Sequence, residues 1–166
     1  MPLLAEGEFA LLRQHLEAAL KKNVILDFVP SGDHDLYAQL VDGAAQQRDQ
    51  AALRKYAPLA EETATRIGHR LYMAIAHRAW GVAHTLAGSY AQAETRFQQA
   101  LEIFMDYPAP WQIGRTLFEM GELARAQGNT EKGRDYFSRA LGAFEELHAA
   151  PYVARTRAAL ENLSRV

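Results

Sequence analysis

A pattern of small and aromatic residues that recurs every 40 residues constrains this chain more than any other feature. Two stretches align directly, and their matching positions are Trp80 and Met120, Gly81 and Gly121, Gly88 and Gly128, Ala93 and Gly133, Phe97 and Phe137, and Ala100 and Ala140. A further step toward the N-terminus reaches a weaker copy, from Tyr37 to Ala60, that has lost both glycines. A fixed stride of this length predicts stacked copies of one supersecondary unit.

Each copy is predicted to form two helices joined by a tight turn. Apolar residues recur at three- and four-residue steps from Leu71 to Leu86 and again from Ala93 to Phe104, as on one face of a helix. Gly88 is expected to take the left-handed conformation that ends a helix, with Ser89 capping the next, and Gly128 repeats this turn. The predicted helices cover residues 5–22, 34–47, 50–68, 70–87, 90–105, 110–127, 130–147 and 151–164.

Two glycines fall inside predicted helices, where glycine costs about 0.5–1 kcal/mol relative to alanine. A helix that accepts this cost at Gly81 and Gly121 is expected to have a close neighbour. The small residues predicted to oppose them are Ala93 and Gly133, with Trp80 as a large residue beside the contact.

Over about residues 35–150 the repeat resembles the tetratricopeptide repeat family, through the order Trp, Gly, Gly, Tyr, Ala, Phe, Ala-Leu of its second copy. The resemblance implies an all-α fold, a right-handed superhelical solenoid of antiparallel helix pairs. It implies one domain over 1–166, made of an N-terminal helix and strap, three repeats and a capping helix. Their expected bounds are 1–33 for the helix and strap, 34–68, 70–105 and 110–147 for the repeats, and 151–164 for the cap.

Two departures from that family matter. The period is 40 rather than the family's usual 34, and the proline that ends a repeat is displaced to positions such as Pro108 and Pro151. The longer variety looks like the helical sensor regions of bacterial signalling regulators. This looser resemblance implies an alternative function, a ligand- or peptide-sensing module.

The N-terminal region is predicted to hold one amphipathic helix followed by an extended strap over residues 23–30. The apolar face of that helix, Phe9, Leu12, Leu16 and Leu20, requires a cover. Either the strap or a second subunit is expected to supply it, so a homodimer through this helix is one hypothesis.

No catalytic motif is present in the sequence. There is no phosphate-binding glycine loop, no Gly-x-Ser-x-Gly elbow and no cysteine. His77 and His84 are seven residues apart and are expected to pack rather than to bind a metal. We therefore expect a non-enzymatic protein with no cofactor and no metal.

The formal net charge of −2 argues against a nucleic-acid partner, and no apolar run is long enough to cross a membrane. The first residues lack the basic flank of a signal peptide, so a cytoplasmic location is expected.

In the resembled family the first helix of each repeat lines a concave binding face. Carrying that rule over by position predicts a groove for a peptide or protein partner, lined by Asp42, Arg78, Val82, Arg115, Phe118, Glu122, Arg125 and Arg155. Ala158 and Asn162 continue it on the terminal helix. Two interpretations stay open: the arginines bind the partner, or they pair with Glu119, Glu122 and other neighbours. Val82 stands where the family's carboxylate clamp has asparagine, so that clamp is not predicted.

Overall fold

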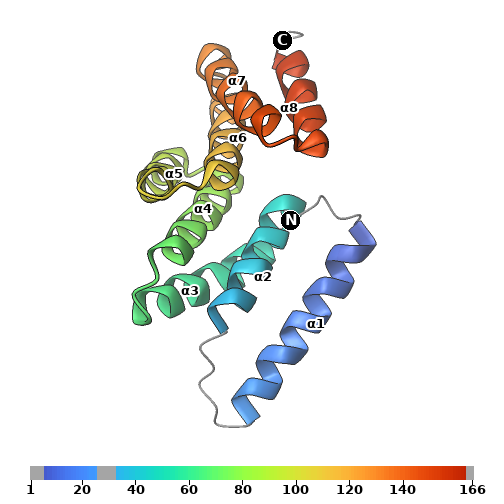
Figure 1. Cartoon of the computed structure of the whole chain (residues 1–166), viewed down its shortest axis with the longest axis vertical. Coiled ribbons are helices and arrows are strands. Elements are labelled where there is room, and N and C mark those ends of the chain that lie inside the picture. The colour runs from blue at the N-terminus through green and yellow to red at the C-terminus, as the bar shows by residue number, and fades with distance from the viewer. Residues whose placement is uncertain (1–5, 26–32, 164–166) are drawn as a thin grey trace.

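The computed structural model describes residues 6–25 and 33–163, and in these ranges the chain is all-helical with no strand (Figure 1). The eight helices are α1 (Glu6–Ile25), α2 (Asp33–Gln47), α3 (Gln50–Arg66), α4 (Arg70–Leu86), α5 (Tyr90–Met105), α6 (Pro110–Ala126), α7 (Thr130–Glu146) and α8 (Ala150–Leu163). The all-α prediction is confirmed.

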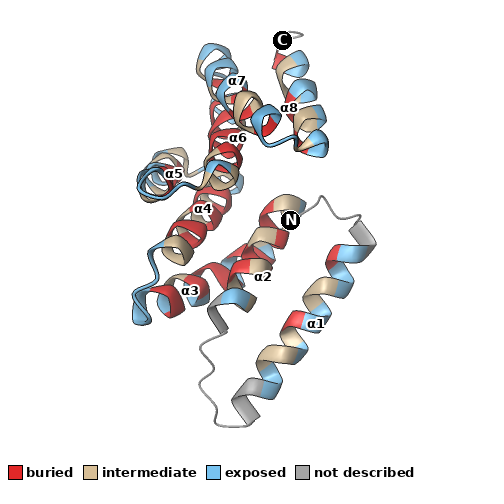
Figure 2. Cartoon of the chain, viewed as in Figure 1, coloured by how far each residue is buried: buried red, intermediate tan, exposed pale blue. Residues whose placement is uncertain are grey.

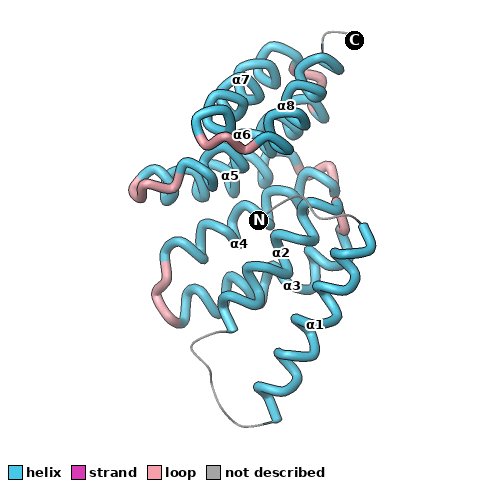
Figure 3. Tube along the Cα trace, turned by 45° about the vertical axis from the view of Figure 1, so that its right-hand side comes forward, coloured by secondary structure: helices cyan, strands magenta, loops and turns pink. Residues whose placement is uncertain are grey.

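The helices follow one another in space as they do in the sequence. Each packs on the next, and α1–α3 lie at one end of the long axis with α7 and α8 at the other (Figure 1). The tube view shows the short turns that join them (Figure 3). In addition, α4 contacts both α2 and α6, so these alternate helices form an inner layer.

The turns recur every 20 residues, half the stride predicted from the sequence. Helices α3 to α8 begin at residues 50, 70, 90, 110, 130 and 150. Left-handed backbone closes most of these turns: Gly88 has φ +74° and Gly128 has φ +73°, as predicted. Arg48 (φ 56°) and His148 (φ 51°) adopt the same conformation without being glycine. The fold therefore keeps the left-handed turn even where, as at Arg48 in the first copy, the sequence has no glycine to indicate it.

The capping residue at these turns differs from one turn to the next. Ser89 lies at the N-cap of α5 but makes no side-chain capping hydrogen bond, contrary to the prediction. Asp49 and Asn129 do cap: their Oδ1 atoms accept from the backbone N–H of Ala52 and Lys132, each at 3.0 Å.

His148 offers a test of the turn geometry, since a non-glycine residue in left-handed backbone costs about 1–2 kcal/mol. We expect His148→Gly to raise the free energy of unfolding by about 0.5–1 kcal/mol, because the strain relieved exceeds the entropy that glycine adds to the unfolded chain. Gly88→Ala should lower it by about 1 kcal/mol. Urea unfolding followed by circular dichroism measures both, and equal signs for the two variants would contradict the assignment.

The helix boundaries agree with the prediction to within a few residues, and α5 agrees at both ends. The largest difference lies at the end of α1, which continues to Ile25, so residues 23–25 of the predicted strap are helical. Valine and isoleucine lower helix propensity by only a fraction of a kcal/mol, so a helix tolerates them at its end. The rest of the predicted strap lies outside the described residues.

Phenylalanine rings lie closest to the glycines inside α4 and α6. A Cβ atom on Gly81 would lie 2.4 Å from Phe97 Cε1, and one on Gly121 would lie 2.6 Å from Phe137 Cε1. The prediction of close packing is confirmed, and the atoms nearest to Gly81 belong to the Phe97 ring, whereas the approach of Ala93 stays a prediction. Gly133 does approach: its Cβ position lies 3.6 Å from the Gly121 carbonyl oxygen.

The other repeat positions form the core that the stride predicted. In Figure 2 the buried residues gather where the helices face one another. The predicted packing residues with no exposed surface are Ala93, Phe97, Ala100, Phe137 and Ala140. Trp80 is only half-buried, whereas Met120 is buried.

Helix α1 is partly covered within the chain. Phe9 and Leu16 are buried, and a Cβ on Gly43 of α2 would lie 3.4 Å from the Phe9 ring. Arg13 Nη1 donates to Asp49 Oδ2 at 2.8 Å, which ties α1 to the start of α3. These contacts cover part of the apolar face of α1, whereas Leu12 and Leu20 are only partly buried, and a homodimer through this helix stays a prediction.

Candidate functional site

The centre of the inner layer is a charged network that joins three helices. Asp42 of α2 accepts from Arg78 Nη2 of α4 at 2.9 Å and from Arg115 Nη1 of α6 at 2.7 Å. Arg78 is 1% exposed and Arg115 7% exposed. Arg78 also donates to Gln112 Oε1 at 2.6 Å, and its guanidinium lies 5.4 Å from the centre of the Phe104 ring. Asp42 therefore links helices that are two repeats apart.

The electrostatics of this network favour the ionised carboxylate. Burial alone would raise the pKa of Asp42, but the positive charges and hydrogen bonds of Arg115 and Arg78 outweigh burial and lower the pKa to about 2. Two buried arginines share this one carboxylate. The network therefore depends on Asp42 for its charge balance.

A second set of ion pairs continues from the network toward the C-terminal end of α6. Arg48, in the turn after α2, donates to Glu119 Oε2 at 2.5 Å and lies 3.6 Å from Glu122 Oε2. Arg125 Nη2 donates to Glu122 Oε2 at 2.6 Å. The left-handed turn at Arg48 thus places a guanidinium against α6.

An open pocket of about 260 Å³ adjoins these pairs. Its lining comes from the turn after α2, from α6 and from α8, and consists of Arg48, Phe118, Glu122, Arg125, Arg155, Ala158, Ala159 and Asn162. The Arg155 guanidinium lies over the Phe118 ring, 4.4 Å from its centre. No carboxylate of the described residues forms an ion pair with Arg155, unlike Arg48 and Arg125.

The structure divides the predicted groove residues into two groups. Phe118, Glu122, Arg125 and Arg155 meet in the open pocket, together with Ala158 and Asn162. The second group lies on the same layer and consists of Asp42, Arg78 and Arg115. These side chains form ion pairs with one another and are largely buried.

The prediction that Val82 lines the groove was wrong, because this side chain has no exposed surface. Helix α4 lies between α2 and α6 and contacts both, so its inward positions become core. Sequence reasoning missed Arg48 and Gln112. The only signal for Arg48 was that an arginine replaces the turn glycine of the other copies.

A third cluster lies between α3, α4 and α5. Glu61 accepts from Trp80 Nε1 at 2.7 Å and from Arg96 Nη1 at 2.6 Å, and Arg96 contacts His77 Nδ1 at 2.8 Å. Burial lowers the pKa of His77, and the charge of Arg96 lowers it further. A neutral imidazole that packs and accepts a hydrogen bond agrees with the packing role expected for this histidine.

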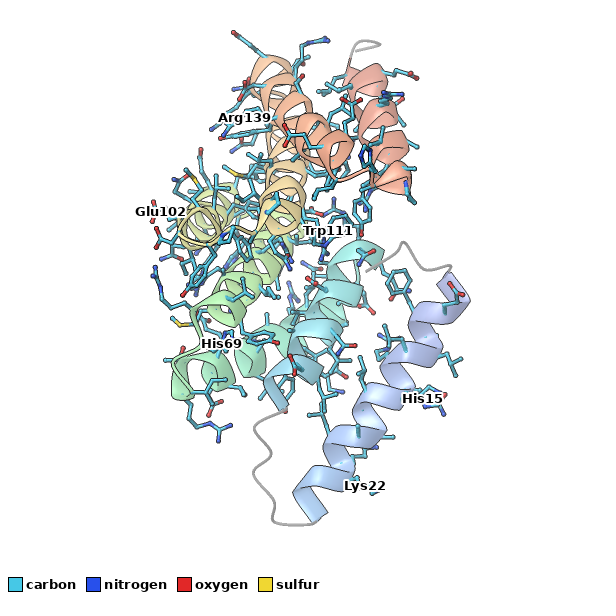
Figure 4. All side chains as sticks on the ribbon, in the orientation of Figure 1. His15, Lys22, His69, Glu102, Trp111 and Arg139 are labelled. Atoms are coloured by element: carbon cyan, nitrogen blue, oxygen red, sulfur yellow. The ribbon has the colours of Figure 1, made fainter. Side chains whose placement is uncertain are left out.

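An aromatic cluster around Trp111 joins α6 to α7 and α8. Trp111 of α6 points into the middle of the molecule, whereas Glu102 and Arg139 point outward from α5 and α7 (Figure 4). The Trp111 ring forms edge-to-face contacts with the rings of Phe144 and Tyr152, at centroid distances of 5.8 and 4.7 Å. Across the described ranges no group of three or more histidine, aspartate or glutamate side chains is placed to hold a metal ion.

No protein-family model matches the chain, and a search of the curated proteins found no significant match. Among the described helices, none is both long and apolar enough to cross a membrane. The tetratricopeptide-like interpretation therefore rests on the repeat residues themselves.

Proposed function

We propose that the protein is a non-enzymatic scaffold, a tetratricopeptide-like solenoid, that binds a peptide or protein segment on its inner layer. The observation that carries this proposal is the open pocket lined by Phe118, Arg125, Arg155 and their neighbours, to which two helices and a turn contribute. A site assembled from separated repeats is typical of helical-repeat binding proteins.

The composition of the pocket also supports a binding role. Arginine and aromatic side chains are enriched where proteins recognise one another, and here Arg155 lies on Phe118 at the pocket wall. Arg125 keeps about half of its side chain exposed, so its guanidinium is accessible to a partner.

A ligand-sensing module is the second candidate. It is favoured by the ion pairs that join helices two repeats apart, Asp42 with Arg115 and Arg48 with Glu119. A ligand that changed the curvature of the stack would have to break or rearrange these pairs. A sensor should therefore show a ligand-dependent change in radius of gyration by small-angle X-ray scattering, which a rigid scaffold should not.

The scaffold proposal can be tested with peptides selected from a random display library. We expect selected peptides to bind with micromolar affinity, and Arg125→Ala/Arg155→Ala to weaken that binding about tenfold or more, since each lost charged hydrogen bond is worth about 1.5–3 kcal/mol. Arg139→Ala removes an exposed arginine from α7 and is the matched control. Fluorescence anisotropy measures the affinities.

Circular dichroism should show that the variants keep their helical content. Selected peptides whose binding is the same in the wild type, the double variant and the control would argue against this pocket as the binding site.

A further inference from the structure

We infer that the pocket between α6 and α8 accepts a carboxylate side chain of an acidic peptide segment, and that Arg155 is its principal ligand. This inference rests on the proposed function and specifies the chemistry of the partner. The structural basis is Arg155, the one guanidinium of the pocket that has no carboxylate partner among the residues that the structure describes.

Arg155 is held in place without being neutralised. The Phe118 ring beneath it is 5% exposed and belongs to the core, so it offers a rigid platform for the guanidinium plane. Arg155 is half-buried and forms no ion pair with a carboxylate of the described residues, and a guanidinium carries paired N–H donors that match the two oxygens of a carboxylate. Arg155 is therefore already oriented before a partner arrives, which lowers the entropic cost of binding.

The charges around the pocket add to this preference. Three guanidiniums, Arg48, Arg125 and Arg155, face only two carboxylates, Glu119 and Glu122. Deeper in the inner layer Arg78 and Arg115 share the single carboxylate of Asp42. These two clusters together hold five guanidiniums and three carboxylates, although the whole chain has a formal net charge of −2.

The size of the pocket suits a side chain. Its volume of about 260 Å³ has room for one carboxylate side chain. Ala158 and Ala159 add small apolar surface for the methylene groups of such a side chain. Outside the pocket, the exposed guanidinium of Arg139 on α7 already has a carboxylate partner, since it lies 3.4 Å from Asp135.

The probe for a test is a fluorescein-labelled, glutamate-rich peptide, compared with the same peptide carrying glutamine at each glutamate position. We expect the glutamate peptide to bind and the glutamine peptide to bind about tenfold more weakly or worse. Arg155→Gln should weaken binding of the glutamate peptide about tenfold, and Arg155→Lys should weaken it by less, because lysine keeps the charge but lacks the planar fork. Arg139→Gln changes the net charge equally and should weaken binding less than about twofold.

Inorganic phosphate and acetate, titrated separately by calorimetry, distinguish a peptide carboxylate from a free anion. Equal effects of Arg155→Gln and Arg139→Gln would overturn the inference, as would phosphate that binds more tightly than the peptide. If library-selected peptides bind through the pocket but glutamate and glutamine peptides bind equally, the inference fails while the scaffold function stands.

Discussion

Replacement of Asp42 by alanine should lower the free energy of unfolding by about 3–5 kcal/mol, the largest effect that we expect from a single substitution in this chain. The alanine would leave Arg78 and Arg115 buried with no carboxylate between them. The cost comes from the uncompensated buried charge rather than from the lost ion pairs themselves.

Urea unfolding followed by circular dichroism measures this change. Asp135→Ala removes an exposed carboxylate from α7 and should stay within about 0.5 kcal/mol of the wild type. A loss of less than about 1 kcal/mol in Asp42→Ala would show that the network contributes little to the fold.

The same network predicts a pH dependence. The pKa of Asp42 is about 2 in the folded protein, below the ordinary value of 3.8, so its contribution is fully present above pH 3.8 and is lost as the pH falls toward 2. The difference in unfolding free energy between the wild type and Asp42→Asn should therefore shrink over that interval. A difference that stays constant from pH 5 to pH 2 would contradict the assignment.

The second large effect is expected at Gly81. In Gly81→Ala the new methyl group would lie within 2.8 Å of three atoms of the Phe97 ring, which has no exposed surface. Overpacking of this kind costs about 1–3 kcal/mol, and we expect the upper half of that range. The measurement is again the free energy of unfolding in urea.

Gly142 supplies a control of opposite sign. It also lies inside a helix, α7, but a Cβ atom there meets no atom within 4 Å. Gly142→Ala should therefore raise the free energy of unfolding by about 0.5–1 kcal/mol through helix propensity.

A double variant tests whether the Phe97 ring is the cause. In the Phe97→Leu background, Gly81→Ala should lower the free energy of unfolding by less than it does in the wild type. An equal loss in both backgrounds would rule out the ring as the cause.

The helices and their core were predictable from the sequence because both depend on local periodicity. The stride of 40 residues located the glycines at 81, 88, 121 and 128, and the packing role of Phe97 and Phe137 followed from their position in the copies. These assignments need only the 3.6-residue period and the conformational freedom of glycine.

The site was less predictable because it depends on how closely helices far apart in the sequence approach one another. Periodicity tells which side of a helix faces inward, but not how close α2 comes to α6. That distance turned Asp42, Arg78 and Arg115 from a groove lining into a largely buried network and placed Val82 in the core. It also brought Arg48 to Glu119, a pairing across 71 residues that no local pattern indicates.

The bridges from α2 to α6 have a consequence for how the chain melts. In an array whose units touch only their neighbours, the end unit can fray while the remainder stays intact. Here unfolding of α2 and of the turn after it would remove Asp42 and Arg48, the partners of Arg115 and Glu119 on α6, so unfolding of one end destabilises a helix two repeats away. Denaturation should accordingly be all-or-none, with coincident transitions for probes placed at the two ends.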